Sequence, residues 1–337
     1  MFIRSKRRPK GCRLDREGFR FHFLGFAMIS TNDAYRSRGG QDADIRPRLD
    51  PVVYPGKSLP GAHALSEHQL ASYRRNGFVF LKNFFDEDEV GLLLSEAQNM
   101  VASDAVRRQE EAISEPGSDA IRSIFRVHQL SALYGRLVAD ARLLDIACQI
   151  LGDEVYIHQS RLNLKPGFEG KDFYWHSDFE TWHVEDGMPR MRAISCVVLL
   201  TENNEFNGPL MLIPGSHQHY VVCAGVTPEH HYKSSLKKQD IGVPDHASLS
   251  TLVGRRGIRA PKGPAGSVVF FDCNTMHGSA SNISPYPRSN LFFVYNAISN
   301  TLQPPSGGLM PRPEFIAARS DCRALKRETR PLGAIEP

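Results

Sequence analysis

His176 and Asp178 form the most informative chemical pair in the sequence, in the run Trp-His-Ser-Asp. Imidazole and carboxylate groups both bind divalent metals, and two strand residues that are two positions apart point to the same side. We therefore expect both side chains to bind one metal ion. A third ligand must come from elsewhere, and His277 is the best candidate because it follows an apolar strand expected at 267–271. The sequence thus predicts a metal centre made of two histidines and one carboxylate.

This ligand set would leave three positions of a ferrous ion open, as in non-haem Fe(II) oxygenases. Those positions suit a bidentate 2-oxoacid together with O2. Arg288 follows His277 by eleven residues, and its forked guanidinium could bind the distal carboxylate of 2-oxoglutarate. Other interpretations remain open at this point. The same ligands could hold zinc, His176 and Asp178 could be a surface histidine and a turn residue, and Arg288 could be a solvated charge.

The composition is that of a globular protein, and it gives no sign of a nucleic-acid or membrane partner. The chain has 337 residues, 41 of them basic and 37 acidic, and much of its net charge of +4 lies before Asp15. The near-neutral remainder argues against a nucleic-acid binder, and no apolar run approaches the ~18 residues of a membrane span. The six cysteines form no Cys-x-x-Cys pair, which fits a reducing cytoplasm and argues against disulfides or a cysteine-rich zinc site.

The chain divides into four predicted parts. Residues 1–27 are expected to be an unstructured extension or the product of a mis-chosen start codon, with Met28 as the initiator. Residues 28–65, rich in Arg, Gly, Pro and Asp, are expected to form an extended arm. A single domain should cover 66–300, and the proline- and arginine-rich segment 301–337 should wrap its surface as a tail.

A few helices followed by many short strands are expected inside the domain. Ser66 begins a capping box for a helix that should end at Asn76, and Asp86 repeats this signal for a long amphipathic helix. A third helical stretch is expected over roughly 131–151, and the polar segment 222–262 is expected to be a loop or lid. Short β-type runs between turn signals favour a barrel or sandwich. These runs are 78–81, 155–158, 161–164, 194–200, 210–213, 267–271 and 291–295.

A stretch of seventeen residues resembles a known family signature. Phe173–Pro189, FYWHSDFETWHVEDGMP, is similar to the signature of the ectoine hydroxylases, a branch of the phytanoyl-CoA dioxygenase superfamily. The runs 207–211, 214–217 and 270–274 continue the similarity, which covers roughly residues 45–320. The resemblance implies a mainly β fold with packed helices, built on a double-stranded β-helix (jelly-roll, cupin-like) core.

The resemblance also implies an activity and a set of site residues. The family hydroxylates ectoine to 5-hydroxyectoine, a compatible solute, with Fe(II), 2-oxoglutarate and O2. The implied iron ligands are His176, Asp178 and His277. The residues implied for 2-oxoglutarate are Asn163, Lys165, Phe173, Ser279 and Arg288. Those implied for the substrate are Gln159, Thr181, Trp182, Ser195, Phe271 and Asn290.

These implied roles make physical sense, and simpler alternatives stand beside some of them. Lys165 and Arg288 supply positive charge for a dianion, and Trp182 could offer its ring to the delocalised cation of ectoine. Phe271 could equally be plain core. Ser195 could be a strand hydroxyl whose hydrogen bonds are satisfied by its neighbours.

Three other functions are compatible with the same residues. The core could hydroxylate another amino-acid derivative such as proline, it could be a cupin-like binding module without turnover, or it could be a zinc hydrolase, although no general base is evident. Because the metal would be the oxidant, the acidic residues Glu180, Glu185 and Asp186 are expected to be structural rather than acid–base groups. The arm and the tail suit a homodimer.

Overall fold

The computed structural model describes residues 33–56, 61–306 and 308–334. The extension predicted for 1–27 and part of the predicted arm lie outside the described residues. Within these ranges, no helix combines the length and the apolar character needed to cross a bilayer.

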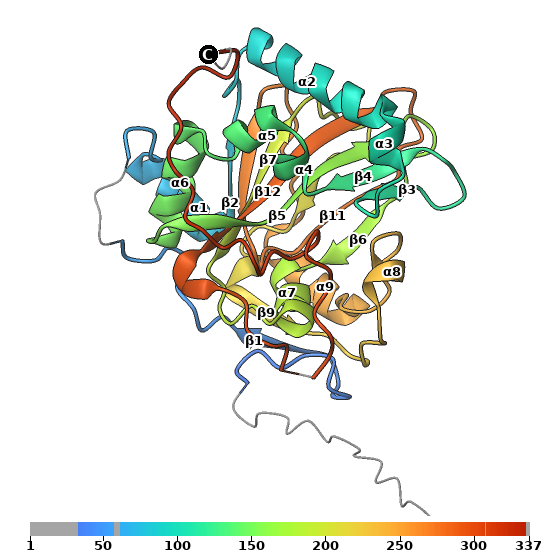
Figure 1. Cartoon of the computed structure of the whole chain (residues 1–337). Coiled ribbons are helices and arrows are strands. Elements are labelled where there is room, and N and C mark those ends of the chain that lie inside the picture. The colour runs from blue at the N-terminus through green and yellow to red at the C-terminus, as the bar shows by residue number, and fades with distance from the viewer. Residues whose placement is uncertain (1–32, 57–60, 307, 335–337) are drawn as a thin grey trace, which may run out of the picture.

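A seven-stranded antiparallel sheet forms the centre of the molecule (Figure 1). Its middle strand, β12 (Arg288–Ala297), lies between β7 (Ala193–Leu199) and β5 (Val155–Lys165). The remaining strands are β10 (Val268–Asp272) and β2 (Phe78–Leu81) beyond β7, and β4 (Ile121–Phe125) and β3 (Ala112–Ser114) beyond β5.

A smaller three-stranded sheet holds two of the residues predicted to bind metal. β11 (His277–Ser279) lies between β6 (Phe173–His176) and β8 (Met211–Leu212) and is antiparallel to both. A separate pair, β1 (Asp44–Pro47) with β9 (His219–Val222), joins the arm to the domain. The predicted mainly β fold of the double-stranded β-helix type, with helices packed around it, is confirmed.

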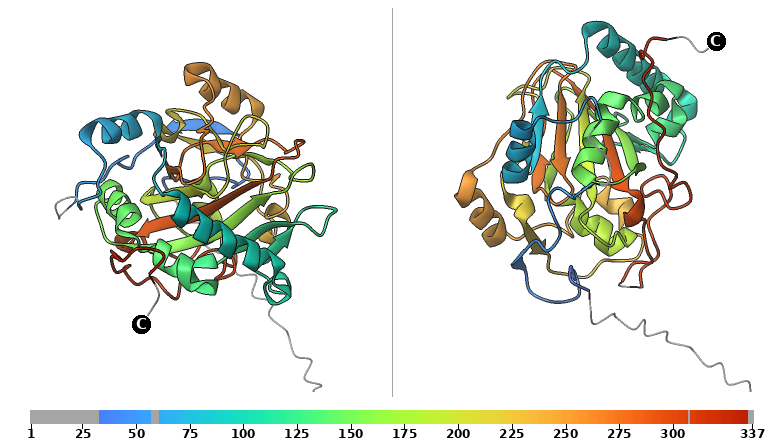
Figure 2. Two further views of the ribbon diagram at one scale, coloured as in Figure 1. Left: turned by 90° about the horizontal axis from the view of Figure 1, so that it is seen from above. Right: turned by 90° about the vertical axis from the view of Figure 1, so that its left-hand side faces the viewer.

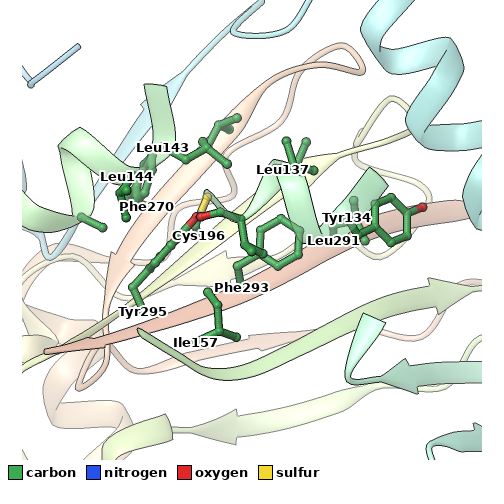
Figure 3. Packing of buried hydrophobic residues seen from close by; sticks show 14 of the residues in the cluster. Tyr134, Leu137, Leu143, Leu144, Ile157, Cys196, Phe270, Leu291, Phe293 and Tyr295 are labelled. Carbon is green, nitrogen blue, oxygen red and sulfur yellow. The ribbon is translucent and has the colours of Figure 1, made fainter. Parts of the chain in front are cut away.

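Helices cover one face of the seven-stranded sheet. Tyr134 of α5 (Ala132–Leu137) and Leu143 of α6 (Ala141–Leu151) share one buried apolar cluster with Phe293 of β12 (Figure 3). Because successive strand residues point to opposite faces, alternate residues of β12 pack under these helices. The residues between them face the interior, where the candidate site lies.

Both predicted helix starts are confirmed. α1 (Glu67–Asn76) begins after Ser66, which forms a reciprocal capping box, and it ends at Gly77, whose φ of 83° is left-handed. α2 (Glu87–Ala102) begins after Asp86 with the same kind of box. In space, α2 lies at the end of the molecule opposite to β1 (Figure 1, Figure 2).

Two predictions divide the chain into elements at the wrong places. The stretch 131–151 is two helices, because the chain turns before Asp140 and the Asp140 side chain starts α6 anew as its N-cap. The runs 155–158 and 161–164 are one strand of eleven residues, β5, in which the residues between them stay extended. The predicted strand 78–81 is confirmed as β2, and the remaining predicted strands shift by one to three residues at their ends.

The segment 222–262 is more than the predicted loop or lid. It contains α8 (Tyr232–Ser235) and α9 (His246–Arg256), and the side chain of Asp245 caps α9. The remaining short helices, which the sequence interpretation also missed, are α3 (Asp104–Arg107), α4 (Val127–Leu130) and the 3-10 turns Ser216–Gln218 and Ile298–Asn300.

The described parts of the arm and the tail pack on the domain. Tyr35 of the arm is buried in an apolar cluster with Trp182. In the tail, the Leu325 N–H donates to the Val155 carbonyl at 2.9 Å, and Ile316 is fully buried. The tail runs past α6 on the outside of the molecule (Figure 1).

Candidate metal and cosubstrate centre

The pairing of β11 with β6 brings together two histidines that are far apart in the sequence. His277 is the direct partner of His176 in the sheet, and their ring centres are 4.2 Å apart. Asp178 lies beyond the strand, as the first residue of α7 (Asp178–Asp186), and its two oxygens are each 3.8 Å from one histidine Nε2. The expectation that His176 and Asp178 share a strand face is therefore wrong. The strand-to-helix turn at Ser177 brings them together instead.

The orientation of both imidazoles suits a metal ion. Nδ1 of His176 lies 2.7 Å from the Tyr174 carbonyl and Nδ1 of His277 lies 3.0 Å from the Thr275 carbonyl, so each Nδ1 carries a proton and donates it. Each Nε2 is then an acceptor that faces a carboxylate, and Nε2 of His277 is buried without a hydrogen-bond partner. The ligand atoms of His176, Asp178 and His277 all lie within 4.8 Å of one another. The two Nε2 atoms and the carboxylate oxygens all carry lone pairs and cannot hydrogen-bond to one another. A divalent cation between them would bind all three groups.

A small cavity beside these groups gathers the residues expected to bind 2-oxoglutarate. It measures about 20 Å³, and Asn163, Phe173, Ser279 and Arg288 line it together with both histidines. Lys165, which faces Arg288 across the β5–β12 pair, donates to the Ser279 hydroxyl at 2.8 Å. All five residues expected for the cosubstrate therefore lie in one place.

Arg288 forms no ion pair within the described part of the chain. It donates to the side-chain oxygen of Asn163 at 2.7 Å and to the Gly208 carbonyl, both of them neutral acceptors. Burial, followed by the like charges of Arg161 and Arg122, lowers the pKa of Arg288 to about 9. Because the cavity has room for roughly one water molecule, a bound dianion must displace some of these contacts and would replace neutral acceptors with charged ones.

Binding of 2-oxoglutarate should be accompanied by proton uptake at Lys165. Burial, then the like charges of Arg288 and Arg122, lowers the pKa of Lys165 to about 6, so its amine is mostly neutral near pH ~7.5 in the free site. A bound dianion favours the ammonium form and raises this pKa, so binding should take up close to ~1 proton. Calorimetry of the anaerobic iron-loaded protein, in two buffers of different ionisation enthalpy, measures the uptake.

The variant Lys165→Met is the matched control and should lose the dependence on buffer. Near pH ~5 the uptake should also fall in the unsubstituted protein, because Lys165 is then already protonated before the dianion binds. A binding enthalpy that is the same in both buffers near pH ~7.5 would contradict this role for Lys165.

A larger cavity of about 790 Å³ also reaches two of the three predicted metal ligands. Gln159, Thr181 and Trp182, three of the six residues expected to contact the substrate, line it. Much of the segment 235–246 forms another part of its wall. The polar segment predicted as a lid therefore borders this cavity, although part of it is helical.

The other three residues expected for the substrate do not line the larger cavity. The Ser195 hydroxyl donates to Asp178 at 3.3 Å, and the Phe271 ring centre lies 4.9 Å from that of His277, so both contact predicted metal ligands. Asn290 is fully buried, and both polar atoms of its amide lack a hydrogen-bond partner. The nitrogen and the oxygen of this amide are therefore available to a further polar group. Contact of these three residues with the substrate stays a prediction.

Three arginines that the sequence interpretation missed also line the larger cavity. Arg161 lines both cavities, and its signal was present, because every second residue of β5 over 159–165 is polar and shares one face of the strand. Arg122 on β4 and Arg312 in the tail had no comparable signal. Arg312 forms a forked pair with Asp186 at the end of α7, with the shorter bond at 2.5 Å.

Comparison with known proteins agrees with the site. The family model described as phytanoyl-CoA dioxygenase matches residues 73–290. An ectoine dioxygenase of Bordetella bronchiseptica is 60% identical over 310 residues, which cover 92% of this chain and 99% of that protein.

Solved structures agree in the fold. EctD from S. alaskensis, solved with 2-oxoglutarate and 5-hydroxyectoine, gives a TM-score of 0.80 at 51% identity and covers 89% of this chain and 99% of its own. The same protein with bound Fe gives a TM-score of 0.79. The family match spans more than half of the chain, and the relatives match over almost their whole length. The chain therefore belongs to the phytanoyl-CoA dioxygenase family, within its ectoine dioxygenase branch.

Proposed function

We infer that this chain is an Fe(II)- and 2-oxoglutarate-dependent dioxygenase that hydroxylates ectoine to 5-hydroxyectoine. The inference rests on one observation. The three metal-binding groups lie between a small cavity lined by cationic side chains and a larger cavity. The relatives named ectoine dioxygenase, and EctD solved with 2-oxoglutarate and 5-hydroxyectoine, indicate the substrate and the cosubstrate.

Each part of the site has one task in this reaction. His176, Asp178 and His277 would hold the iron, and Fe(II) with 2-oxoglutarate supplies the activation of O2 for insertion into a C–H bond. Arg288 would bind the distal carboxylate of the cosubstrate through its fork, and Lys165 would balance the remaining charge. The chain itself contributes placement, because small errors in the position of reacting groups cost rate.

The larger cavity offers what a small zwitterion requires. Trp182 presents an aromatic ring to the delocalised cation of ectoine, and this ring is held by an edge contact with His158 at 5.0 Å between centres. Arg161 brings positive charge to the wall for the carboxylate, whereas the charge of Arg312 is paired with Asp186. The amide nitrogen of Gln159 is bound to the tail backbone at 2.8 Å, which leaves its oxygen able to accept from the substrate.

The test is mass spectrometry of ectoine incubated with the iron-loaded protein, 2-oxoglutarate and O2. We expect a product heavier by one oxygen atom, formed together with succinate. Neither should appear when 2-oxoglutarate is omitted or when zinc replaces iron. Oxygen insertion into proline but not into ectoine would favour a hydroxylase of another amino-acid derivative. The absence of succinate with every substrate would favour a binding module without turnover.

Trp182→Ala should impair ectoine binding much more than iron binding. A buried cation–π contact is worth about 2 kcal/mol, so the KM for ectoine should rise about thirtyfold. Trp182→Phe keeps an aromatic face, so its KM for ectoine should rise less. Steady-state kinetics and metal content after dialysis check both effects, and an equal loss of ectoine and iron affinity in Trp182→Ala would remove the case for a pocket role.

We also propose that the enzyme acts as a homodimer in the cytoplasm. Two adjoining loops expose large apolar side chains, Phe168 at 68% and Ile283 at 83%, and the Phe168 N–H donates to the Ser284 carbonyl. Exposed apolar patches mark protein contacts. The described cysteines are free, which suits a reducing compartment. Light scattering should give twice the chain mass, and Ile283→Glu should lower it; a monomer in the unsubstituted protein would contradict the dimer.

A further inference from the structure

Arg38, in the arm, is buried against the helix that begins with Asp178. Its side chain has an exposure of 0%. Nε donates to the two oxygens of Glu180 at 2.9 and 3.1 Å, and Nη1 donates to Glu185. The backbone of Arg38 has a φ of 53°, which is costly for a residue with a side chain, and its N–H donates to the Cys223 carbonyl at 3.0 Å. The contacts around this guanidinium therefore fix it firmly.

The same guanidinium reaches the wall of the larger cavity. Nη2 of Arg38 donates to the Thr181 hydroxyl at 2.9 Å, and Thr181 lines the cavity. Gln239, which lines the cavity from the segment after α8, donates to the same hydroxyl at 3.3 Å. A Cβ built on Gly242 would lie 2.0 Å from Nη2, so the backbone of this segment packs directly on Arg38.

Two further contacts tie this segment to α7. Nη1 of Arg38 donates to the Thr227 hydroxyl at 3.3 Å, and Nδ1 of His231 lies 3.0 Å from the Glu185 carboxylate that Arg38 also binds. The segment 227–242 is thus attached to the helix through one arginine and its two glutamates. Glu180 and Glu185 bind Arg38, which fits the structural role expected for them because the metal would be the oxidant.

We propose that Arg38 is a positioning residue for the substrate side of the site. It fixes Thr181 and the segment 227–242 and thereby sets the affinity for the substrate; this inference rests on the proposed hydroxylation of ectoine. The metal ligands depend on other contacts, namely the β6–β11 pairing and the bond from the Phe179 N–H to the Cys273 carbonyl at 2.8 Å. The cosubstrate cavity is lined mainly by residues of β5, β6, β11 and β12, none of which Arg38 contacts through a hydrogen bond. Arg38 should therefore affect the affinity for ectoine and not the affinity for 2-oxoglutarate.

The main test is the variant Arg38→Lys. Lysine keeps a positive charge beside both glutamates, but without the planar fork it cannot also hold Thr181. The KM for ectoine should rise at least about tenfold, as expected for one lost charge-assisted hydrogen bond, with kcat changed less than about threefold. The KM for 2-oxoglutarate and the iron content should stay within about twofold of the unsubstituted protein. Arg46→Lys, at an exposed arginine of the same arm, is the matched control and should change none of these.

Gln239→Leu is a second variant for the case that Arg38→Lys does not fold. Gln239 is only partly buried, and its loss should also raise the KM for ectoine. The two effects should be less than additive in the double variant, because both act through Thr181. An unchanged KM for ectoine in folded Arg38→Lys, or in Gln239→Leu if the first does not fold, would overturn the inference, as would a parallel loss of iron. Lack of ectoine hydroxylation by the unsubstituted protein would instead overturn the proposed function, and this inference with it.

Discussion

Asp178→Ala should abolish iron retention and lower the rate of ectoine hydroxylation by more than about a thousandfold, or at least about 4 kcal/mol in the barrier. Asp178 is the one carboxylate in the cluster with His176 and His277, and its two oxygens face both free imidazole nitrogens. Removing it leaves two neutral ligands and takes away the one negative charge that attracts a dication. Metal content after dialysis and the rate of product formation measure the two losses separately.

Two further variants separate loss of the ligand from loss of the fold. Asp178→Asn keeps the size of the side chain and an acceptor for the Ser195 hydroxyl, so a similar loss of iron there would assign the effect to charge. His68→Ala removes an exposed imidazole on α1 and should leave iron and rate unchanged. Full activity in folded Asp178→Ala would show that the carboxylate is not a ligand.

The ligand types were predictable from sequence, whereas their geometry was not. The spacing of His176 and Asp178 is local, so it can be recognised in a single line of sequence. Whether the chain after Ser177 continues as a strand or begins a helix depends on where α7 packs. The β6–β11 pairing joins strands of only four and three residues, and so short a strand carries little preference for a partner. His277 could be predicted as a ligand from the apolar strand that precedes it in the sequence, and not from its pairing with His176.

Helix starts were the most predictable part of the fold, because a cap and its helix are neighbours in the chain. The side chains of Ser66 and Asp86 act within three residues. Asp140 also caps a helix, inside 131–151, but its side chain accepts from the backbone N–H of Arg142 and forms no capping box, so its signal in the sequence is weaker. The long strand β5 was divided in two because Gln159 and Ser160 are consecutive polar residues inside it, and only the structure shows that both are buried.

The walls of the larger cavity were the least predictable part of the site. They come from β4, β5, β6, α7, the segment 235–246 and the tail, which are far apart in the sequence and meet only in the folded structure. Arg312 stands in a proline-rich stretch that resembles a solvated tail, yet it is buried against Asp186. Arg38 stands in a stretch expected to be an extended arm, and nothing near it in the sequence indicates the glutamates that it binds.

Arg288→Ala should raise the KM for 2-oxoglutarate by about a hundredfold to a thousandfold, because a buried forked ion pair to a carboxylate contributes roughly 3–4 kcal/mol. In the free protein Arg288 donates only to neutral acceptors, on Asn163 and Gly208. Its charge is therefore available to an incoming anion. Arg288→Lys keeps the charge without the fork and should give an intermediate rise. Rates measured against 2-oxoglutarate concentration, at saturating ectoine and iron, provide the values.

The division of the effect between KM and kcat identifies what Arg288 does. The distal carboxylate of the cosubstrate does not react, so its contact with Arg288 contributes equally to the ground state and the transition state. In Arg288→Ala, kcat at saturating 2-oxoglutarate should therefore recover to within a few-fold of the unsubstituted protein, and the KM for ectoine should stay unchanged. A KM for 2-oxoglutarate that did not move would show that another group binds this carboxylate. A kcat that stayed low at saturation would mean that Arg288 shapes the cavity through Asn163 and Gly208 rather than binding the cosubstrate.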